Sequence, residues 1–346
     1  MATSAEAVRV PRRRLSIGDT IGLGIVGLII LWLIWNFSSG PQQFVQVAVI
    51  GVSNGALYAL VALGYTLVYG IIELINFAHG DLFMLGGVFS ATLLSNWLGY
   101  QHSSPGAWAT AMLLVLPATM AFCCILNVVI ERLAYRRLRN AGKLAPLITA
   151  VGVSFILQNI GLVWNGSAPQ SRPTILGNGS LNIGSISIGY PYIWTILVTV
   201  VLLLIMRYIV VKTRQGKAMR ATAQDPDAAR LMGIDVNRTI AFVFGLGGAM
   251  AGAAAIMYVQ ANGETRYDAG FEFGLIAFTA AVLGGIGNLA GAVLGGLLIG
   301  VIQAANDGLP HGLGQEWSQS VVFTVLIGLM VFRPSGLLGA QVVDKV

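Results

Sequence analysis

Polar residues that could do chemistry gather at one point of an otherwise apolar region. Four of them fall within residues 63–81: Glu73, Asn76, His79 and Asp81. A charged side chain at the centre of a bilayer costs about 2.5–3.5 kcal/mol on insertion scales, so such residues tend to face a cavity or an interface. Glycines interrupt the same stretch, and interrupted helices at membrane depth often surround a transported substrate. The segment supplies the first candidates for a translocation path: Asn76, His79, Gly80 and Asp81.

The same residues also fit a plainer interpretation, a short cytoplasmic turn between two membrane spans. For Glu73 alone we favour that turn. For Asn76, His79 and Asp81 we keep both alternatives, a structural or gating role and an ordinary turn. A His near an Asp could also relay protons, as in secondary transporters, but a single pair does not define a relay.

A second interruption lies near the C-terminal end, where Gly284-Gly285-Ile286-Gly287-Asn288 separates two short apolar runs. Small residues let helix backbones approach closely where lipid supplies no hydrophobic drive. Small-xxx-small spacing occurs in three places, at glycines 248 and 252, 291 and 295, and 296 and 300. Tight packing within one bundle explains most of these glycines, while some could mark broken helices around a pathway. The path candidates from this interruption are Gly284, Gly285, Gly287 and Asn288.

A short, self-contained helix is predicted within the basic loop 212–238. Asp225 is a good N-cap and Pro226 suits the first helical position. Asp227 lies at the positive end of the helix dipole, and Gly233 suits a left-handed C-terminal cap. The apolar side chains of this helix are Ala228, Leu231 and Met232. The complete contact helix comprises Asp225, Pro226, Asp227, Ala228, Ala229, Arg230, Leu231, Met232 and Gly233.

A capped helix between two membrane spans has no core of its own against which to bury an apolar face. One interpretation is that it inserts into a groove on a partner protein. The alternative is a surface helix at the lipid headgroups, held there by its basic neighbours. The spacing favours docking onto a partner.

The elements that must position these segments are membrane-spanning helices. Hydrophobic residues make up 56% of the chain and charged residues only 10%, against about 25% charged in soluble domains. A spanning helix needs about 20 mostly apolar residues. The candidate spans are residues 17–35, 44–69, 77–98, 107–130, 146–164, 191–211, 239–259, 274–288, 290–306 and 318–332. Because the eighth and ninth are short, eight or nine full crossings are possible, with half-helices making up the rest. We interpret the first as an uncleaved span rather than a signal peptide, because it is long and further spans follow at once.

The basic residues predict the orientation, because cytoplasmic loops are enriched in Lys and Arg. With the N-terminus inside, eighteen of the twenty Lys and Arg residues are cytoplasmic, and only Arg172 and Arg266 lie outside. The net charge of +6 is therefore a topology signal and does not indicate a nucleic-acid partner. The outside segments 165–190 and 262–272 could dock an extracytoplasmic binding protein, or could be plain solvated loops.

The sequence lacks the sets of residues that several enzymatic and metal-binding functions require. The two cysteines, Cys123 and Cys124, are adjacent, which disfavours a disulfide between them and gives no metal-ligand spacing. There is no Gly-x-x-x-x-Gly-Lys-Ser/Thr phosphate loop, since Ala218 follows Gly216-Lys217. No nucleophile–base–acid set stands out, so an intramembrane hydrolase is disfavoured.

The predicted contact helix resembles a known element. With Asp in place of Glu, Asp227-Ala-Ala-Arg-Leu-Met-Gly233 is similar to the Glu-Ala-Ala-x-x-x-Gly coupling loop of ABC importer membrane subunits. The Ile-x-Leu-Pro that follows in that loop is missing, and Val243-Phe244-Gly245 stands in its place. This form resembles the LivH-type family of branched-chain amino-acid permeases. Four further segments match that family in order, at residues 59–70, 75–81, 278–288 and 332–339. The resemblance covers roughly residues 42–340.

The resemblance implies an all-α, polytopic membrane bundle of about eight to ten spans with interrupted helices, working by alternating access. It implies a permease domain (42–340) with its coupling loop (212–238). The basic N-terminal extension with the first span (1–41) lies outside the resemblance, and a tail (341–346) follows the permease domain. Such a permease is a subunit of an ATP-driven importer for branched-chain or related amino acids, in the bacterial inner membrane with both termini cytoplasmic. Its expected partners are ABC ATPase subunits, a second related permease, an extracytoplasmic amino-acid-binding protein and the lipid membrane. ATP and Mg would be used by the ATPase, and this chain would bind no cofactor or metal and no nucleic acid.

Three alternatives are kept. The nearest is an ABC permease for urea, amides or another small solute such as a sugar. A self-contained secondary transporter would need its own coupling residues and no ATPase. A scaffold or assembly factor would carry no solute, although intramembrane polar groups and broken helices are expensive features for a scaffold.

Overall fold

The computed structural model describes residues 31–74, 76–99, 107–139, 141–142, 144–172, 179–184, 186–332 and 335–339. The chain divides into two compact units, Met1–Pro41 and Gln42–Val346. In the first unit, residues 31–39 are helical. The basic N-terminus, most of the predicted first span and the tail 341–346 lie outside the described residues.

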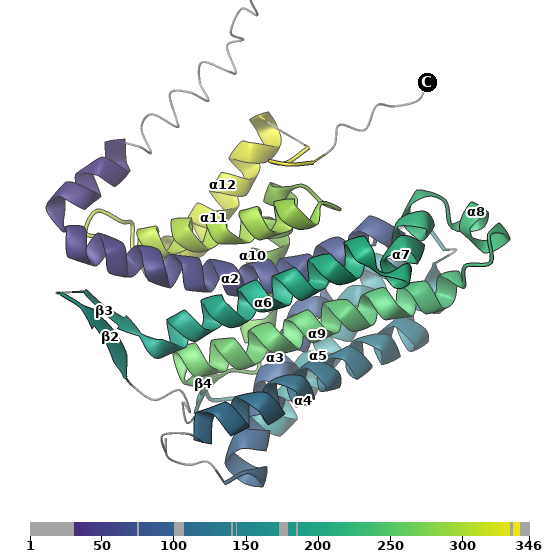
Figure 1. Ribbon diagram of the computed structural model, residues 1–346, viewed down its shortest axis with the longest axis horizontal. Helices are drawn as coiled ribbons and strands as arrows, with labels where there is room; N and C mark the ends of the chain where they lie inside the picture. Colours follow the sequence, from purple (N-terminus) through teal and green to yellow (C-terminus); the bar gives the residue numbers. More distant parts are fainter. Residues whose placement is uncertain are drawn as a thin grey trace, which may run out of the picture. The chain divides into compact units, whose positions relative to one another are not determined.

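The second unit is built from helices (Figure 1). In chain order these are α2 (Pro41–Ile72), α3 (Ala78–Thr92), η1 (Leu93–Trp97), α4 (Ala107–Ile130), η2 (Glu131–Tyr135), η3 (Arg136–Leu138), α5 (Leu144–Asn165), α6 (Tyr190–Lys212), α7 (Arg214–Gln224), α8 (Pro226–Leu231), α9 (Val236–Asn262), α10 (Ala269–Gly284), α11 (Leu289–Gly308), η4 (Gln315–Trp317) and α12 (Ser318–Phe332). The prediction of a polytopic helical membrane bundle is confirmed.

Six helices among the described residues are long and apolar enough to cross a membrane. They are Pro41–Ile72, Met112–Leu138, Leu144–Asn165, Tyr190–Lys212, Val236–Asn262 and Leu289–Gly308. The helices α3, α10 and α12 are shorter, at 15, 16 and 15 residues. The predicted span 274–288 was placed too late in the chain: α10 begins at Ala269 and ends at Gly284, because Gly285 adopts a φ of 107° that leaves the helix.

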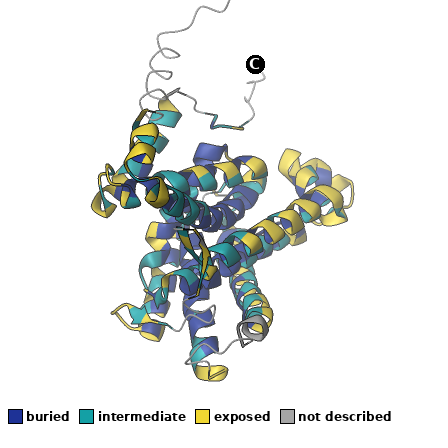
Figure 2. Ribbon diagram, turned by 60° about the vertical axis from the view of Figure 1, so that its left-hand side comes forward, coloured by how far each residue is buried: buried dark blue, intermediate teal, exposed yellow. Residues whose placement is uncertain are grey.

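Burial is concentrated in α2, α3, α9 and α10, and the outer faces of the surrounding helices are exposed (Figure 2). Glycines make this central packing close. A Cβ added at Gly248 would lie 2.8 Å from the Cβ of Asn127, and one added at Gly252 would lie 2.7 Å from the Thr119 carbonyl oxygen. A Cβ at Gly296 would lie 2.6 Å from the backbone nitrogen of Ala59. These glycines therefore serve helix packing, as the small-xxx-small spacing predicted.

Two small antiparallel sheets, which the sequence did not reveal, occupy the predicted outside segments. β1 (Gln170–Ser171) pairs with β4 (Glu264–Thr265), so the loop after α5 is joined to the loop after α9. β2 (Ser180–Ile183) and β3 (Ile186–Gly189) form a hairpin before α6. The outside loops are therefore partly ordered by each other.

Candidate functional site

The predicted contact helix is present as α8, with the predicted caps. The Asp225 side chain accepts hydrogen bonds from the backbone N–H groups of Asp227 and Ala228, both at 2.9 Å. Pro226 is the first helical residue, and Gly233 has a φ of 80°, in the left-handed region that favours glycine. The sequence analysis missed the preceding helix α7, which ends at Gln224. Asp225, with extended backbone, separates it from α8, and we call the two helices together the arm.

The apolar face of α8 has no cover within the described chain. Leu231 is 89% exposed and Met232 is 83% exposed, whereas Ala229 is buried. Arg230 donates to the Asp227 carboxylate at 2.5 Å across an exposed face of the helix. Exposed large apolar side chains on a rigid, well-capped helix are typical of a surface that binds another protein.

A cavity of about 780 Å³ lies beside the arm, lined by residues of α7, α8, α9, η3 and the end of α2. Its polar lining includes Glu73, Arg139, Thr222, Arg230 and Asn237. Glu73 is exposed and has a φ of 51°, an uncommon value for a residue other than glycine, where it ends α2. This position agrees with the interpretation of Glu73 as a residue of a turn.

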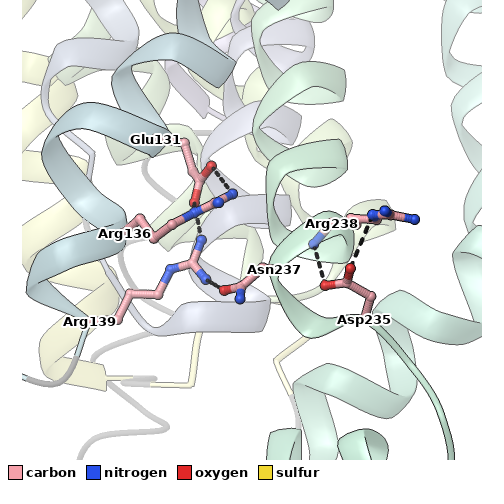
Figure 3. A network of polar contacts seen from close by, with 6 residues as sticks. All are labelled: Glu131, Arg136, Arg139, Asp235, Asn237 and Arg238. Atoms are coloured by element: carbon pink, nitrogen blue, oxygen red, sulfur yellow. Dashed lines mark hydrogen bonds and ion pairs between the residues drawn. The ribbon is translucent and has the colours of Figure 1, made fainter.

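A buried carboxylate that the sequence analysis did not single out lies at the centre of a polar network that reaches the start of α9, the helix that follows the arm (Figure 3). Glu131 at the end of α4 is fully buried and pairs with Arg136 at 3.2 Å and with Arg139. Arg139 also donates to the Asn237 side chain at 2.9 Å, in the first turn of α9. Burial lowers the pKa of Arg139, and the Glu131 carboxylate opposes that shift. The α4 end is therefore fastened to the start of α9, a few residues after α8.

The same α4 end reaches the first candidate segment. Tyr135 donates its hydroxyl proton to the Asn76 side-chain oxygen at 2.7 Å, and both residues are buried. α2 ends at Ile72 and α3 begins at Ala78, so the helices are interrupted beside Asn76, as the glycine-interrupted pattern predicted. Asn76 is thus bound to the segment that carries Glu131, which connects the helix break with the Glu131 network.

The other polar residues of this segment point into the bundle. His79 is 1% exposed and its ring lies 4.9 Å from that of Tyr65. Asp81 is fully buried and accepts a hydrogen bond from the Ser154 hydroxyl of α5 at 2.5 Å. Gly80 packs against Gly274 of α10, where an added Cβ would lie 2.7 Å from the Gly274 Cα. The ordinary solvated turn therefore does not describe residues 76–81, which are packed between helices.

The second candidate segment is a structured turn between α10 and α11. Asn288 caps α11 by accepting a hydrogen bond from the Gly291 N–H at 3.1 Å, and its amide donates to the Leu338 carbonyl at 2.7 Å. Gly285 and Gly287 both have positive φ, at 107° and 87°. An added Cβ at Gly70, near the end of α2, would lie 3.4 Å from the Gly287 Cα. The two candidate segments thus flank the same end of α2, and their place on a translocation path stays a prediction.

A polar cluster holds the opposite loops together. Arg172 donates to the side chains of Asn165 at 2.9 Å and of Thr265 at 3.3 Å. Its backbone N–H donates to the Gly263 carbonyl at 2.7 Å. Burial lowers the pKa of Arg172. The basic residue that the charge count left outside is therefore structural, joining the end of α5 to the loop after α9.

Comparison with known proteins agrees with this arrangement. A family model described as "Branched-chain amino acid transport system / permease component" matches residues 47–330. The chain belongs to this permease family. It is 40% identical over 310 residues to the high-affinity branched-chain amino acid transport system permease protein BraD of Pseudomonas aeruginosa, covering 88% of this chain and 98% of that protein. It is 38% identical over 315 residues to the corresponding protein LivH of Escherichia coli, covering 88% and 98%.

A more distant relative is named for the import of a different solute. The autoinducer 2 import system permease protein LsrD of Salmonella paratyphi B is 26% identical over 200 residues, covering 54% of this chain and 59% of that protein. Family membership makes this chain a multi-pass permease component. The resemblance carried by residues 59–70, 75–81, 227–233, 278–288 and 332–339 is thereby confirmed.

Proposed function

We propose that this chain is the membrane-spanning permease subunit of an ATP-driven importer for branched-chain or related amino acids. The proposal rests on one observation above all: the capped helix α8 carries exposed Leu231 and Met232 and is fastened, through α9, to the buried Glu131 network. A partner that moves α8 would move the cytoplasmic ends of α4 and α9 with it. The resemblance of residues 227–233 to the coupling loop of ABC importers supports an ABC ATPase as that partner.

The remaining partners follow from the same assembly. A second related permease would complete the transmembrane pathway, and an extracytoplasmic binding protein would deliver the amino acid onto the loops joined by Arg172. ATP and Mg would be bound by the ATPase, with no cofactor on this chain. The protein would lie in the bacterial inner membrane with both termini in the cytoplasm, as the distribution of Lys and Arg indicates.

The test replaces the exposed apolar face without disturbing a core. The double variant Leu231→Glu, Met232→Glu should insert and fold normally, because both side chains are solvent-exposed. We expect it to lose co-purification of the ATPase and uptake of labelled leucine. The matched control is Leu313→Glu, at a side chain 68% exposed in the turn after α11, which should retain both. Normal ATPase recovery and uptake in the double variant would refute the coupling role of α8.

A second candidate is an ABC permease for another small solute, which the similarity to the autoinducer 2 import permease keeps in view. The higher identity to amino-acid permeases over most of the chain favours the amino acid. Uptake of labelled leucine, urea and ribose by cells with and without the gene separates the two. Loss of urea or ribose uptake alone would leave the coupling mechanism standing and replace the substrate. A secondary transporter would take up its solute without any ATPase.

A further inference from the structure

In three of the spanning helices, α4, α5 and α6, most residues are not buried by the rest of the bundle. In α4 and α6 the uncovered positions in the middle of the span are apolar. In α6 they are Leu197, Val200, Val201, Leu204 and Ile205; in α4 they are Leu113, Leu114, Pro117, Ala121, Ile125 and Val129. Surfaces of this composition suit contact with lipid tails.

The exposed face of α5 differs from those of α4 and α6 because it also carries polar residues. It carries the exposed amide of Asn159 and the exposed Gly152 among apolar neighbours, with Gln158 half-buried at its edge. An open hollow of about 660 Å³ lies on this face, and Gln158 lies beside it rather than in its lining. The hollow is lined by Phe155, Ile156, Asn159, Ile160, Val163 and Trp164, so Asn159 is the one polar residue among them. Polar side chains within membrane spans almost always face protein or a water-filled cavity, because lipid tails offer them no partners.

A chain of hydrogen bonds leads from this face to a carboxylate inside the bundle. The Gln158 side-chain amide donates to the Ser154 hydroxyl oxygen at 3.2 Å, and the Ser154 hydroxyl donates to the Asp81 carboxylate at 2.5 Å. Ser154 is 4% exposed and Asp81 is fully buried. The other Asp81 oxygen, Oδ1, finds no hydrogen-bond donor among the described residues. Ser154 lies near the middle of the 22-residue span α5, so the carboxylate lies at membrane depth.

The direction of these hydrogen bonds determines which atom of Gln158 remains available to a ligand. The Ser154 hydroxyl donates to the Asp81 carboxylate, so the Ser154 oxygen is the acceptor for the Gln158 N–H. The carbonyl oxygen Oε1 of Gln158 accepts no hydrogen bond from the described residues. Each hydrogen bond in such a series polarises the next, which strengthens Oε1 as an acceptor.

We propose that the α5 face bearing Phe155, Gln158 and Asn159 lines the amino-acid path, and that Gln158 Oε1 accepts a hydrogen bond from the substrate's ammonium group. Asp81 and Ser154 are positioning residues, which act through Gln158. The apolar side chain of the amino acid passes along Phe155. The Asn159 amide nitrogen donates one N–H to the Phe155 carbonyl at 2.8 Å and offers its second N–H to the substrate carboxylate. This inference rests on the proposed function for its substrate class, whereas the exposure of the face to water is tested independently of transport.

The first experiment measures water access in the assembled transporter. Phe155→Cys and Asn159→Cys are compared with Leu204→Cys on α6 and Ile125→Cys on α4, since Phe155, Leu204 and Ile125 are similarly uncovered, at 60%, 61% and 64%. A charged, membrane-impermeant methanethiosulfonate labels the thiols, and the unsubstituted protein, with Cys123 buried and Cys124 half-buried, gives the background. We expect labelling of the two α5 positions only, slowed severalfold when binding protein loaded with leucine is present. The two controls should react only with a lipid-soluble maleimide.

The outcomes separate this inference from the proposed function. If the protein imports leucine but the α5 thiols react like the controls, α5 faces lipid and the path proposal is overturned. The same holds if these thiols form disulfides with the second permease in every state and never react with the charged reagent. If the α5 thiols are water-accessible and protected by a different solute, the path stands and the amino-acid assignment falls.

The second experiment tests the positioning chain. Ser154→Ala breaks the link between Gln158 and the carboxylate, while Ser154→Thr keeps a hydroxyl at the same site. We expect the alanine variant to raise the leucine concentration needed for half-maximal uptake about tenfold, the equivalent of one hydrogen bond to a charged group. The threonine variant should restore most of the affinity. Equal uptake by the two variants, at equal protein levels, would overturn the role of the chain.

Discussion

Removing the charge of Glu131 should destabilise the bundle by a measurable amount. In the variant Glu131→Gln the shape is kept, but Arg136 and Arg139 lose their common counter-charge. Breaking a fully buried ion pair costs about 3–5 kcal/mol, and a fully exposed pair contributes about 0–1 kcal/mol. Glu131 is 0% exposed, while Arg139 and Arg136 are 15% and 37% exposed and can be partly rehydrated. We therefore expect a loss of about 2 kcal/mol, between these limits.

The assay is thermal unfolding of the purified protein in detergent, followed by loss of the monodisperse peak. With an unfolding entropy of about 2.1 cal/mol/K per residue, a helical unit of roughly 300 residues loses about 3 °C in Tm for about 2 kcal/mol. The control is Asp268→Asn, which breaks the exposed pair with Arg266 and should shift Tm by less than about 1 °C.

The reasoning fails if the Tm of the Glu131→Gln variant equals that of the unsubstituted protein, or is no lower than the Tm of the Asp268→Asn variant. A stricter check is the double variant Glu131→Gln, Arg139→Gln. Arg139→Gln removes the main partner of Glu131. The stability lost by the double variant should therefore be smaller than the sum of the losses in the two single variants. Strict additivity would show that the pair does not act as a unit.

Three further changes have expected outcomes. Gly80→Val places a side chain where α3 meets Gly274, so we expect little folded protein on size exclusion, whereas Gly328→Ala, with open space around it, should fold normally. Asn288→Ala removes the cap of α11 and should cost about 1 kcal/mol, read as a lower Tm. Arg172→Ala separates the two outside loops, which should raise cleavage by an added protease on the outer face of intact spheroplasts; unchanged cleavage would contradict its structural role.

The sequence was sufficient to predict the helices and the capped helix α8 because both depend on local signals. Apolar runs of about 20 residues predict spans, and Asp225, Pro226 and Gly233 predict a capped helix with little influence from the rest of the chain. Where the helix boundary depended on a glycine conformation, as at Gly285, the predicted span was misplaced by several residues. A run of apolar residues does not reveal which glycine leaves the helix.

The site residues that escaped prediction are those whose importance arises only from tertiary contacts. Ser154 and Gln158 are ordinary polar residues of a span until Asp81, 73 positions from Ser154 in the chain, is brought beside them. Glu131 stands in the sequence as a single acid beside arginines, and only the fold shows that it is buried. One signal was available: a single acid directly after an apolar span and just before several arginines requires a partner if it is buried.

Tyr135 provides the most direct test of whether the cytoplasmic network and the helix break act together. Tyr135→Phe keeps the ring that packs 5.6 Å from Phe244 but removes the hydroxyl that donates to Asn76 at 2.7 Å. The lost hydrogen bond should cost about 1 kcal/mol. Tyr58→Phe is the matched control, because that hydroxyl is also buried and donates to Gln303 at 2.6 Å, on α11 away from the arginines. If the Asn76 contact transmits motion from α8, only the Tyr135 variant should import less leucine per ATP hydrolysed at equal stability. Equal transport ratios in both variants would assign Tyr135 to packing alone.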